Sequence, residues 1–271
     1  MKTHSKLLPA LLLLILVVPP VVAGGPPENG PHVEYYENGK KKYEGHYKDD
    51  ELDGLKTHWW ENGQKKLKVH YKAGLPDGLW THWYKNGKKA SEAHYKNGKL
   101  VSASVWKPGS KPCPITKVVD GSGIVVNWYE NGQKWFETPY KNGELDGLVT
   151  EWYENGKKES ETHYKDGEPD GLWTEWHKNG KKREEVQYKN GEPDGVWTEW
   201  YENGKKREEG HWKNGEADGL WTEWYENGKK QSETPFNNGK QNGLWTYWHE
   251  NGKKKSEVQY KDVKEISRKE F

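Results

Sequence analysis

The chain has 271 residues, with 43 Lys and Arg against 42 Asp and Glu. This even balance predicts neither a basic track for nucleic acid nor an acidic tail, so bulk charge indicates no particular partner. Leu, Ile, Val and Phe are sparse after residue 23, but 17 Trp and 16 Tyr can supply the buried apolar area that a core needs.

The N-terminus has the pattern of a signal peptide. Two lysines precede an apolar run at Leu7–Val18, and small residues before Gly24 offer a cleavage site. The pattern predicts a signal peptide over residues 1–23, a linker over 24–29, and export to the periplasm, the cell envelope or the medium. An uncleaved anchor is the alternative and the one expected route to a membrane, but the run is short for a span of about 20 residues.

A 24-residue unit repeats along almost the whole chain. Successive units open on glycines at this constant spacing, except for one longer interval between Gly78 and Gly123. The opening glycines are Gly30, Gly54, Gly78, Gly123, Gly147, Gly171, Gly195, Gly219 and Gly243. We predict three regular hairpin repeats over residues 30–100, six over 123–260, and a charged tail at 261–271.

Residues 101–122 depart from the repeat. The segment keeps Trp106 and a turn at Pro108-Gly109, but it lacks the Asp-Gly opening of the other units. We interpret it as a degenerate repeat or an insert. A linker between two domains is the alternative, and loop length does not separate the two interpretations.

Each unit carries the local signal of a β-hairpin. An Asn-Gly pair follows the aromatic run, as in "WYENGKK", and predicts a two-residue type I′ turn because both residues tolerate a positive φ. In the unit that Gly171 opens, this turn would place Trp173 opposite Val186 and Trp176 opposite Arg183.

Alternation along the strand gives each hairpin two aromatic faces. Trp173 and Glu175 share one face, and Leu172, Thr174 and Trp176 share the other. The second face repeats as a tryptophan ladder, which we expect to replace a globular core. The ladder comprises Trp59, Trp83, Trp128, Trp152, Trp176, Trp200, Trp224 and Trp248. The predicted fold class is all-β, an elongated antiparallel meander of tandem 24-residue β-hairpin repeats.

The recurring "DGLWTEWYENGKK" and "YKNGE" resemble the MORN repeat family, in the bacterial variant known from YwqK-type antitoxins. The resemblance covers residues 30–260. It implies an open, twisted sheet that acts as a scaffold or protein-binding surface, without catalytic residues, and for the antitoxin subset it implies neutralisation of a toxin by binding. The apolar N-terminus departs from a cytoplasmic antitoxin, so either the target is met in the envelope or the antitoxin role does not apply.

Motifs for chemistry are missing from the sequence. It has no G-x-S-x-G, no H-E-x-x-H and no Walker-type glycine loop, so we expect neither an enzyme nor a cofactor. His58 and His82 occupy a position that is Glu in later units, which indicates a polar stripe rather than metal ligands. The Asp-Gly pairs come only once per unit, too far apart for a calcium loop. Cys113 is the single cysteine, which excludes an intrachain disulfide.

Four tryptophans that follow an opening glycine by two residues are the candidate contacts, together with the glutamates two positions further on. The set is Trp173, Trp197, Trp221, Trp245, Glu175, Glu199 and Glu223. Trp80 occupies the same position, but the remaining units have His, Lys or Val there, so we expect these rings to be exposed. A protein partner is the first interpretation, since Trp is a favoured interface anchor. Glycan binding on Trp and Tyr platforms is the alternative, and a nucleic-acid partner is not expected. In a third interpretation, all the rings are core residues.

Overall fold

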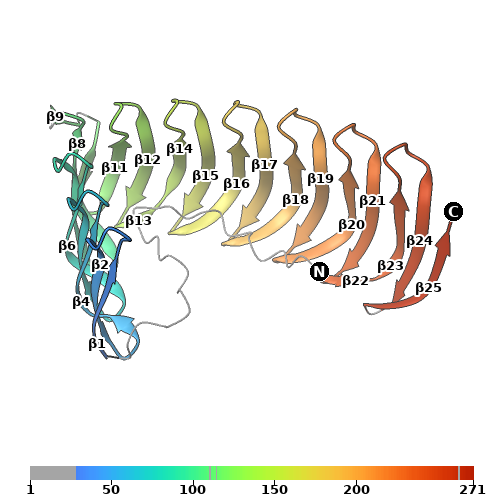
Figure 1. Cartoon of the computed structure of the whole chain (residues 1–271), viewed down its shortest axis with the longest axis horizontal. Helices are drawn as coiled ribbons and strands as arrows, with labels where there is room; N and C mark the ends of the chain where they lie inside the picture. Colours follow the sequence, from blue (N-terminus) through green and yellow to red (C-terminus); the bar gives the residue numbers. More distant parts are fainter. Residues whose placement is uncertain (1–28, 110, 114, 262) are drawn as a thin grey trace.

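The computed structural model describes residues 29–109, 111–113, 115–261 and 263–271, so the predicted signal peptide and most of the linker lie outside the described residues. Within the described ranges the fold is all-β, with 25 strands whose pairings are all antiparallel. No described helix is long and apolar enough to cross a membrane. The strands follow one another as a meander in one open sheet (Figure 1).

The strand bounds follow the repeating unit. The first part of the sheet contains β1 (Asn29–Tyr35), β2 (Lys41–Lys48), β3 (Glu51–Leu52), β4 (Gly54–Trp59), β5 (Lys65–Lys72), β6 (Leu75–Trp83), β7 (Lys89–Lys96), β8 (Lys99–Lys107), β9 (Lys111–Pro112) and β10 (Lys117–Val119). The second part contains β11 (Ser122–Trp128), β12 (Lys134–Lys141), β13 (Glu144–Leu145), β14 (Gly147–Trp152), β15 (Lys158–Lys165), β16 (Glu168–Trp176), β17 (Lys182–Lys189), β18 (Glu192–Trp200), β19 (Lys206–Lys213), β20 (Glu216–Trp224), β21 (Lys230–Asn237), β22 (Lys240–Gln241), β23 (Gly243–Trp248), β24 (Lys254–Lys261) and β25 (Lys264–Glu270).

The irregular segment 101–122 lies within the sheet. Strand β10 pairs with β11 and, through the single pair Val118 and Ala103, with β8, so it stands where the second strand of a regular hairpin would stand. Three turns converge beside it, because Leu100 N donates to Gly143 O at 3.1 Å and Gly143 N donates to Gly121 O at 2.8 Å. Strands β1–β8 turn away here from the line of β11–β25 (Figure 1).

The observed register agrees with the predicted one for most of the hairpin and differs near its tip. Trp173 lies opposite Val186, as predicted, but a bulge between Glu175 and Trp176 places Trp176 opposite Lys182 instead of Arg183. Because of the bulge, the Arg183 side chain lies on the face of Glu175, where it forms an ion pair.

The type I′ turn occurs at the opposite end of the hairpin from the one predicted. At the tip, Gly180 N donates to His177 O at 2.7 Å and only Gly180 has a positive φ, which describes a type I turn followed by a glycine bulge. At the link between hairpins, Asn190 and Gly191 have φ of 49° and 83°, as a type I′ turn requires. The prediction failed because Asn-Gly occurs in both turns.

The tip motif connects each hairpin to the next. Tyr153 Oη donates to Trp176 O at 2.6 Å, and Lys157 Nζ donates to Asn179 O at 2.8 Å. Asn155 Nδ2 donates to the carbonyl of the residue 23 positions later, at 3.3 Å. The same three bonds recur in the units that Gly30, Gly195 and Gly219 open, and part of the set recurs in other units, so the tip residues hold neighbouring tips together.

The two faces of the sheet differ in burial, opposite to the prediction. On the packed face, defined by Trp173, Val186, Tyr188 and their equivalents, these three side chains are 6%, 0% and 2% exposed. On the ladder face, defined by Trp176, Lys182 and their equivalents, the tryptophans are half-buried. Lysines separate the ladder rings, since Lys182 lies opposite Trp176 and its Nζ is 5.7 Å from the next ring along. The core is therefore on the packed face.

The expected charged tail at residues 261–271 contains a strand. Strand β25 pairs with β24 from Lys264 to Glu270, and all seven of its residues are exposed. Arg268 binds Glu265 through two nitrogens, each 3.0 Å from a carboxylate oxygen. A strand rich in charge is a usual way for a sheet to end without attracting further strands.

Candidate functional site

The candidate tryptophans lie on the packed face, and three of them are core residues. Trp173, Trp197 and Trp221 are each 6% exposed, so the expectation that they are exposed platforms is wrong. Trp245 is half-buried, as are the carboxylates of Glu175, Glu199 and Glu223. The physical reason is the partner strand: Val186 lies opposite both Trp173 and Trp197 and offers them an apolar neighbour.

Trp221 is held differently from Trp197 because its neighbour on the preceding strand is a glycine, whereas Trp197 has Val186 there. Gly210 stands where Val186 stands one unit earlier, and a Cβ at Gly210 would overlap the Trp221 ring. Without that side chain, Trp221 stacks on Trp197 with ring centroids 5.2 Å apart and planes 28° from parallel. The substitution of Val by Gly therefore joins two tryptophans of successive units.

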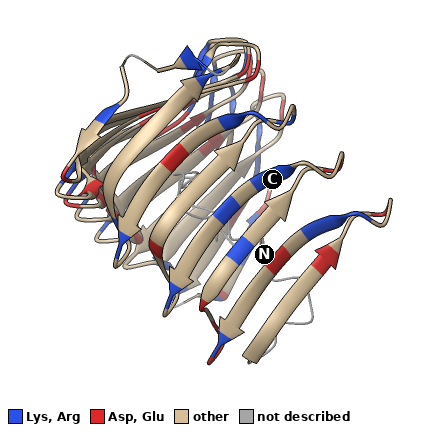
Figure 2. Ribbon diagram, turned by 90° about the vertical axis from the view of Figure 1, so that its left-hand side faces the viewer, with Lys and Arg blue, Asp and Glu red and all other residues tan. Residues whose placement is uncertain are grey.

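Five glutamates form a carboxylate row across five consecutive strands, β16 to β20. The row comprises Glu175, Glu184, Glu199, Glu208 and Glu223, and each lies directly opposite the next in register. Like charges directly opposite one another destabilise a sheet, so such a row needs neutralisation. Elsewhere on the sheet, Lys and Arg are interspersed with Asp and Glu (Figure 2).

Protonation and pairing with arginine both reduce the charge repulsion within the carboxylate row. Burial raises the pKa of Glu184 to about 7 even though Trp197 Nε1 donates to it at 2.6 Å, and burial with neighbouring carboxylates raises the pKa of Glu208 to about 7. Arg183 Nη1 lies 2.6 Å from Glu175, and the equivalent arginine of the next unit makes the same contact.

The histidine and aspartate positions have structural surroundings. Burial lowers the pKa of His58 and His82 to about 4, which keeps both rings neutral. Asp77 Oδ2 accepts from Asn97 N in the following turn at 3.3 Å. Within the described part of the chain, no group of three or more His, Cys, Asp or Glu side chains could hold a metal ion.

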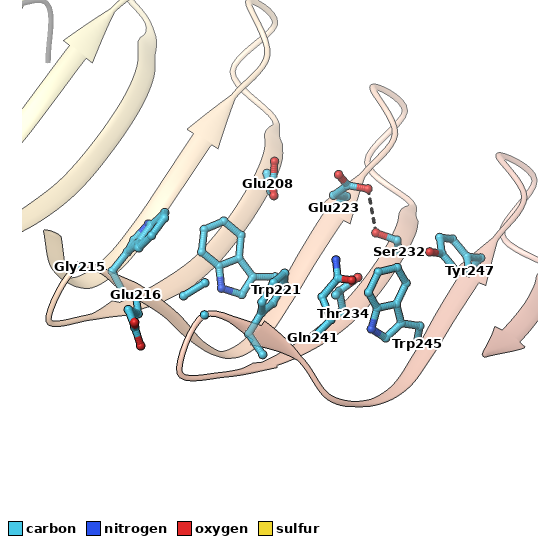
Figure 3. Close-up of a pocket in the computed structure, with 14 residues that line it drawn as sticks. Glu208, Gly215, Glu216, Trp221, Glu223, Ser232, Thr234, Gln241, Trp245 and Tyr247 are labelled. Atoms are coloured by element: carbon cyan, nitrogen blue, oxygen red, sulfur yellow. Dashed lines mark hydrogen bonds between the residues drawn. The ribbon is translucent and has the colours of Figure 1, made fainter. Parts of the chain in front are cut away.

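An aromatic hollow of about 440 Å³ lies on the packed face between β19 and β23 (Figure 3). Trp221, Trp245 and Tyr247 line it, together with the carboxylates of Glu208 and Glu223. No basic side chain is among the described residues that line it. Within the described chain, the hollow therefore combines apolar walls with carboxyl groups and no internal cation.

The hollow lies in two units that lack the proline of the two units before them. Ala217 and Gln241 stand where Pro169 and Pro193 stand in the two preceding units, and both line the hollow. In Figure 3, Thr234 and Gln241 lie between the rings of Trp221 and Trp245. Because Ala lacks the ring of Pro, Ala217 fills less of this space than Pro169 and Pro193 fill in their units.

The walls of the hollow are rings in mutual contact. Trp212 meets Trp221 edge to face at 5.3 Å, and Phe236 meets Trp221 at 5.7 Å. Trp245 lies 6.1 Å from Tyr247. The indole nitrogens of Trp212 and Trp245 are buried with no hydrogen-bond acceptor among the described residues, so each is a donor that a ligand could satisfy.

Nine segments of the chain match the family described as MORN repeat variant. They are residues 28–49, 52–73, 76–97, 122–142, 145–166, 169–190, 193–214, 217–238 and 241–262. The chain belongs to the MORN repeat variant family. No curated protein matches the chain. Among solved structures, the crystal structure of TcdB2-TccC3 is similar at 9% identity and a TM-score of 0.16; the match covers 84% of this chain and 15% of that one.

The sequence prediction included Trp221, Trp245 and Glu223 of the hollow and missed the rest of it. Trp212 and Tyr247 were not selected as candidates. In most units of this MORN repeat protein the position of Trp212 is Tyr, and the position of Tyr247 is Glu or His. The signal that could have found them was the departure from the repeat itself. Trp173, Trp197 and their glutamates belong to the packed core and the carboxylate row outside the hollow.

Proposed function

We propose that this MORN repeat protein is an exported, non-enzymatic scaffold that binds a partner protein through its packed face. The observation that carries the proposal is the aromatic hollow between β19 and β23. Its walls include Trp221, Trp245 and Tyr247, and Trp and Tyr are among the residue types that most often anchor protein interfaces. The two units before it have a proline where the units around the hollow have Ala217 and Gln241, so the repeat changes at this place.

Export and an antitoxin-like role belong to the same proposal. The sequence pattern of residues 1–23 favours export, and the resemblance to YwqK-type repeats favours neutralisation of a partner toxin by binding. The two fit together if the partner is met in the cell envelope or outside the cell. The carboxylate row beside the hollow favours a partner whose contacting segment is basic.

The test is affinity capture with the chain lacking residues 1–23, from an envelope extract of the cells that make it, with mass spectrometry of the eluate. Trp245→Ala is the test variant, and Trp248→Ala is its control because that half-buried ring lies on the ladder face of the same strand. We expect a stoichiometric protein that Trp245→Ala loses and Trp248→Ala keeps. Capture that neither variant changes would contradict binding through the hollow.

Glycan binding is the second candidate, and one observation favours it. The donors Trp212 Nε1 and Trp245 Nε1 lie beside aromatic faces, an arrangement that suits a sugar ring and its hydroxyl groups. Capture of wall polysaccharide in place of protein, lost in Trp245→Ala, would replace the protein-binding proposal with this one.

A further inference from the structure

We infer that the aromatic hollow takes one arginine side chain of the partner protein, with its guanidinium paired to Glu223. The inference rests on the proposed function and adds the chemistry of the contact. The hollow supplies the rings of Trp245 and Tyr247 and the carboxylates of Glu208 and Glu223. A cation between apolar walls and carboxylates is complementary to this lining in both shape and charge.

The chain itself shows how a guanidinium binds at this position. Arg183 Nη1 lies 2.6 Å from Glu175 Oε1, and one unit later Arg207 Nη1 lies 2.6 Å from Glu199 Oε1. Each arginine is the extra residue at the bulge of its hairpin and reaches the glutamate that follows the packed-face tryptophan by two positions. The geometry is therefore repeated in two successive units.

The third unit lacks the arginine. Gln231 stands one unit after Arg207, and Glu223 stands one unit after Glu199. Glu223 accepts a hydrogen bond from Ser232 Oγ at 2.7 Å and has no ion pair within the described residues (Figure 3). The carboxylate that has lost its internal arginine is the one that lines the hollow.

Its neighbour increases the need for a cation. Glu208 lies directly opposite Glu223 in the sheet and is 9% exposed, so two carboxylates face each other across adjacent strands. A guanidinium suits such a site better than an ammonium, because it is less strongly hydrated, stacks on rings and can bind two carboxylate oxygens at once. Trp245 Nε1, which has no acceptor among the described residues, is left as a donor for a carbonyl of the arginine-bearing segment.

The first experiment uses the full chain, labelled with ¹⁵N at tryptophan, and the blocked tripeptide Gly-Arg-Gly as the probe. We expect a saturable shift of the Trp245 indole resonance. The same peptide with citrulline, which keeps the shape and removes the charge, is expected to bind at least tenfold more weakly. Equal shifts with the two peptides would overturn the inference.

Two variants test the site independently. Gln231→Arg restores the internal arginine, so we expect it to fill the site and weaken the Gly-Arg-Gly titration at least tenfold, while Gln187→Arg adds the same charge on the ladder face and leaves the titration unchanged. Glu223→Gln removes the carboxylate and is expected to weaken the Gly-Arg-Gly titration. Glu202→Gln, at an exposed tip, is its control and should leave the titration unchanged. Titrations unchanged in both test variants would refute the assignment.

The failure of this inference differs from the failure of the proposed function. Suppose that the wild-type chain captures a partner, that Trp245→Ala loses it and that Gln231→Arg keeps it. This result would support the proposed scaffold function and would contradict the inference that the hollow binds an arginine. A partner lost in Gln231→Arg and kept in Gln187→Arg supports both.

Discussion

The indole nitrogen of Trp197 on β18 donates a 2.6 Å hydrogen bond to Oε1 of Glu184 on β17. The donor belongs to a ring that is 6% exposed, and the acceptor belongs to the carboxylate row. Glu184 is therefore held by the core side chain beside it. This contact connects the packing of the sheet to its charge, and both can be tested.

Trp197→Ala is expected to lower the free energy of unfolding by about 3–5 kcal/mol, the usual cost of truncating a buried aromatic. Trp200→Ala is the matched control, because Trp200 lies on the same strand, half-buried on the ladder face. Urea denaturation followed by tryptophan fluorescence measures both. Equal losses, or a larger loss for Trp200→Ala, would show that the packed face is not the core.

Stability is expected to fall as the pH rises from about 4.5 to about 7. The pKa of Glu184 and of Glu208 is raised to about 7, so the folded chain holds protons in this window that the unfolded chain has released. Folding is then favoured by these groups below pH 4.5, and the contribution is lost as the pH passes 7. Glu184→Gln should flatten the slope of urea midpoint against pH, whereas exposed Glu202→Gln should not.

Lys56→Met is expected to raise the free energy of unfolding by about 1–3 kcal/mol at pH 7, because a buried ammonium is replaced by an apolar side chain of similar length. Lys56 is 4% exposed, its Nζ lies 5.7 Å from the ring of Tyr43, and burial lowers its pKa to about 8. The wild type should also gain stability between pH 8 and 10.5, where its unfolded state binds more protons. Lys213→Met, at an exposed site, serves as control; a stability loss in Lys56→Met would mean that the ring contacts outweigh desolvation.

Ala73→Asn is expected to stabilise the chain by about 0.5–1 kcal/mol, because a left-handed conformation is unfavourable for Ala and better tolerated by Asn. Ala73 has a φ of 48° in a type I′ turn, where most other units have Asn or Asp. Thermal unfolding against Asn190→Ala, which should lose a similar amount, provides the reciprocal measurement. The same sign of change in both variants would contradict the turn assignment.

The sequence predicted the hairpins, their constant period and the pairing of Trp173 with Val186, because these depend on local turns and alternation. It predicted the wrong face as the core. Both faces carry tryptophan, so alternation alone could not choose between Trp173 and Trp176. The cross-strand partners distinguish the two faces. Val186, opposite Trp173, is apolar, whereas Lys182, opposite Trp176, carries a charge that stays hydrated.

The hollow was harder to predict, because it comes from departures from the repeat. Trp221 and Trp245 were selected as members of a series, yet Trp221 is core and Trp245 is half-buried. What distinguishes this part of the sheet from the two preceding units is Ala217 in place of proline and Gln231 in place of arginine. A repeat alignment shows such substitutions, but their effect depends on how the neighbouring rings fill the space.

The bonds between neighbouring tips determine the order in which the chain can fold. Tyr153 and Trp176 are 23 residues apart, and the equivalent tip contacts span 22 or 23 residues, except across the irregular segment, where Asn86 reaches Glu130. Each regular hairpin therefore finds its partners as soon as the next unit has been synthesised, without closing a long loop. Assembly can proceed one hairpin at a time from either end or from the middle, and damage to one unit stays confined to its two neighbours.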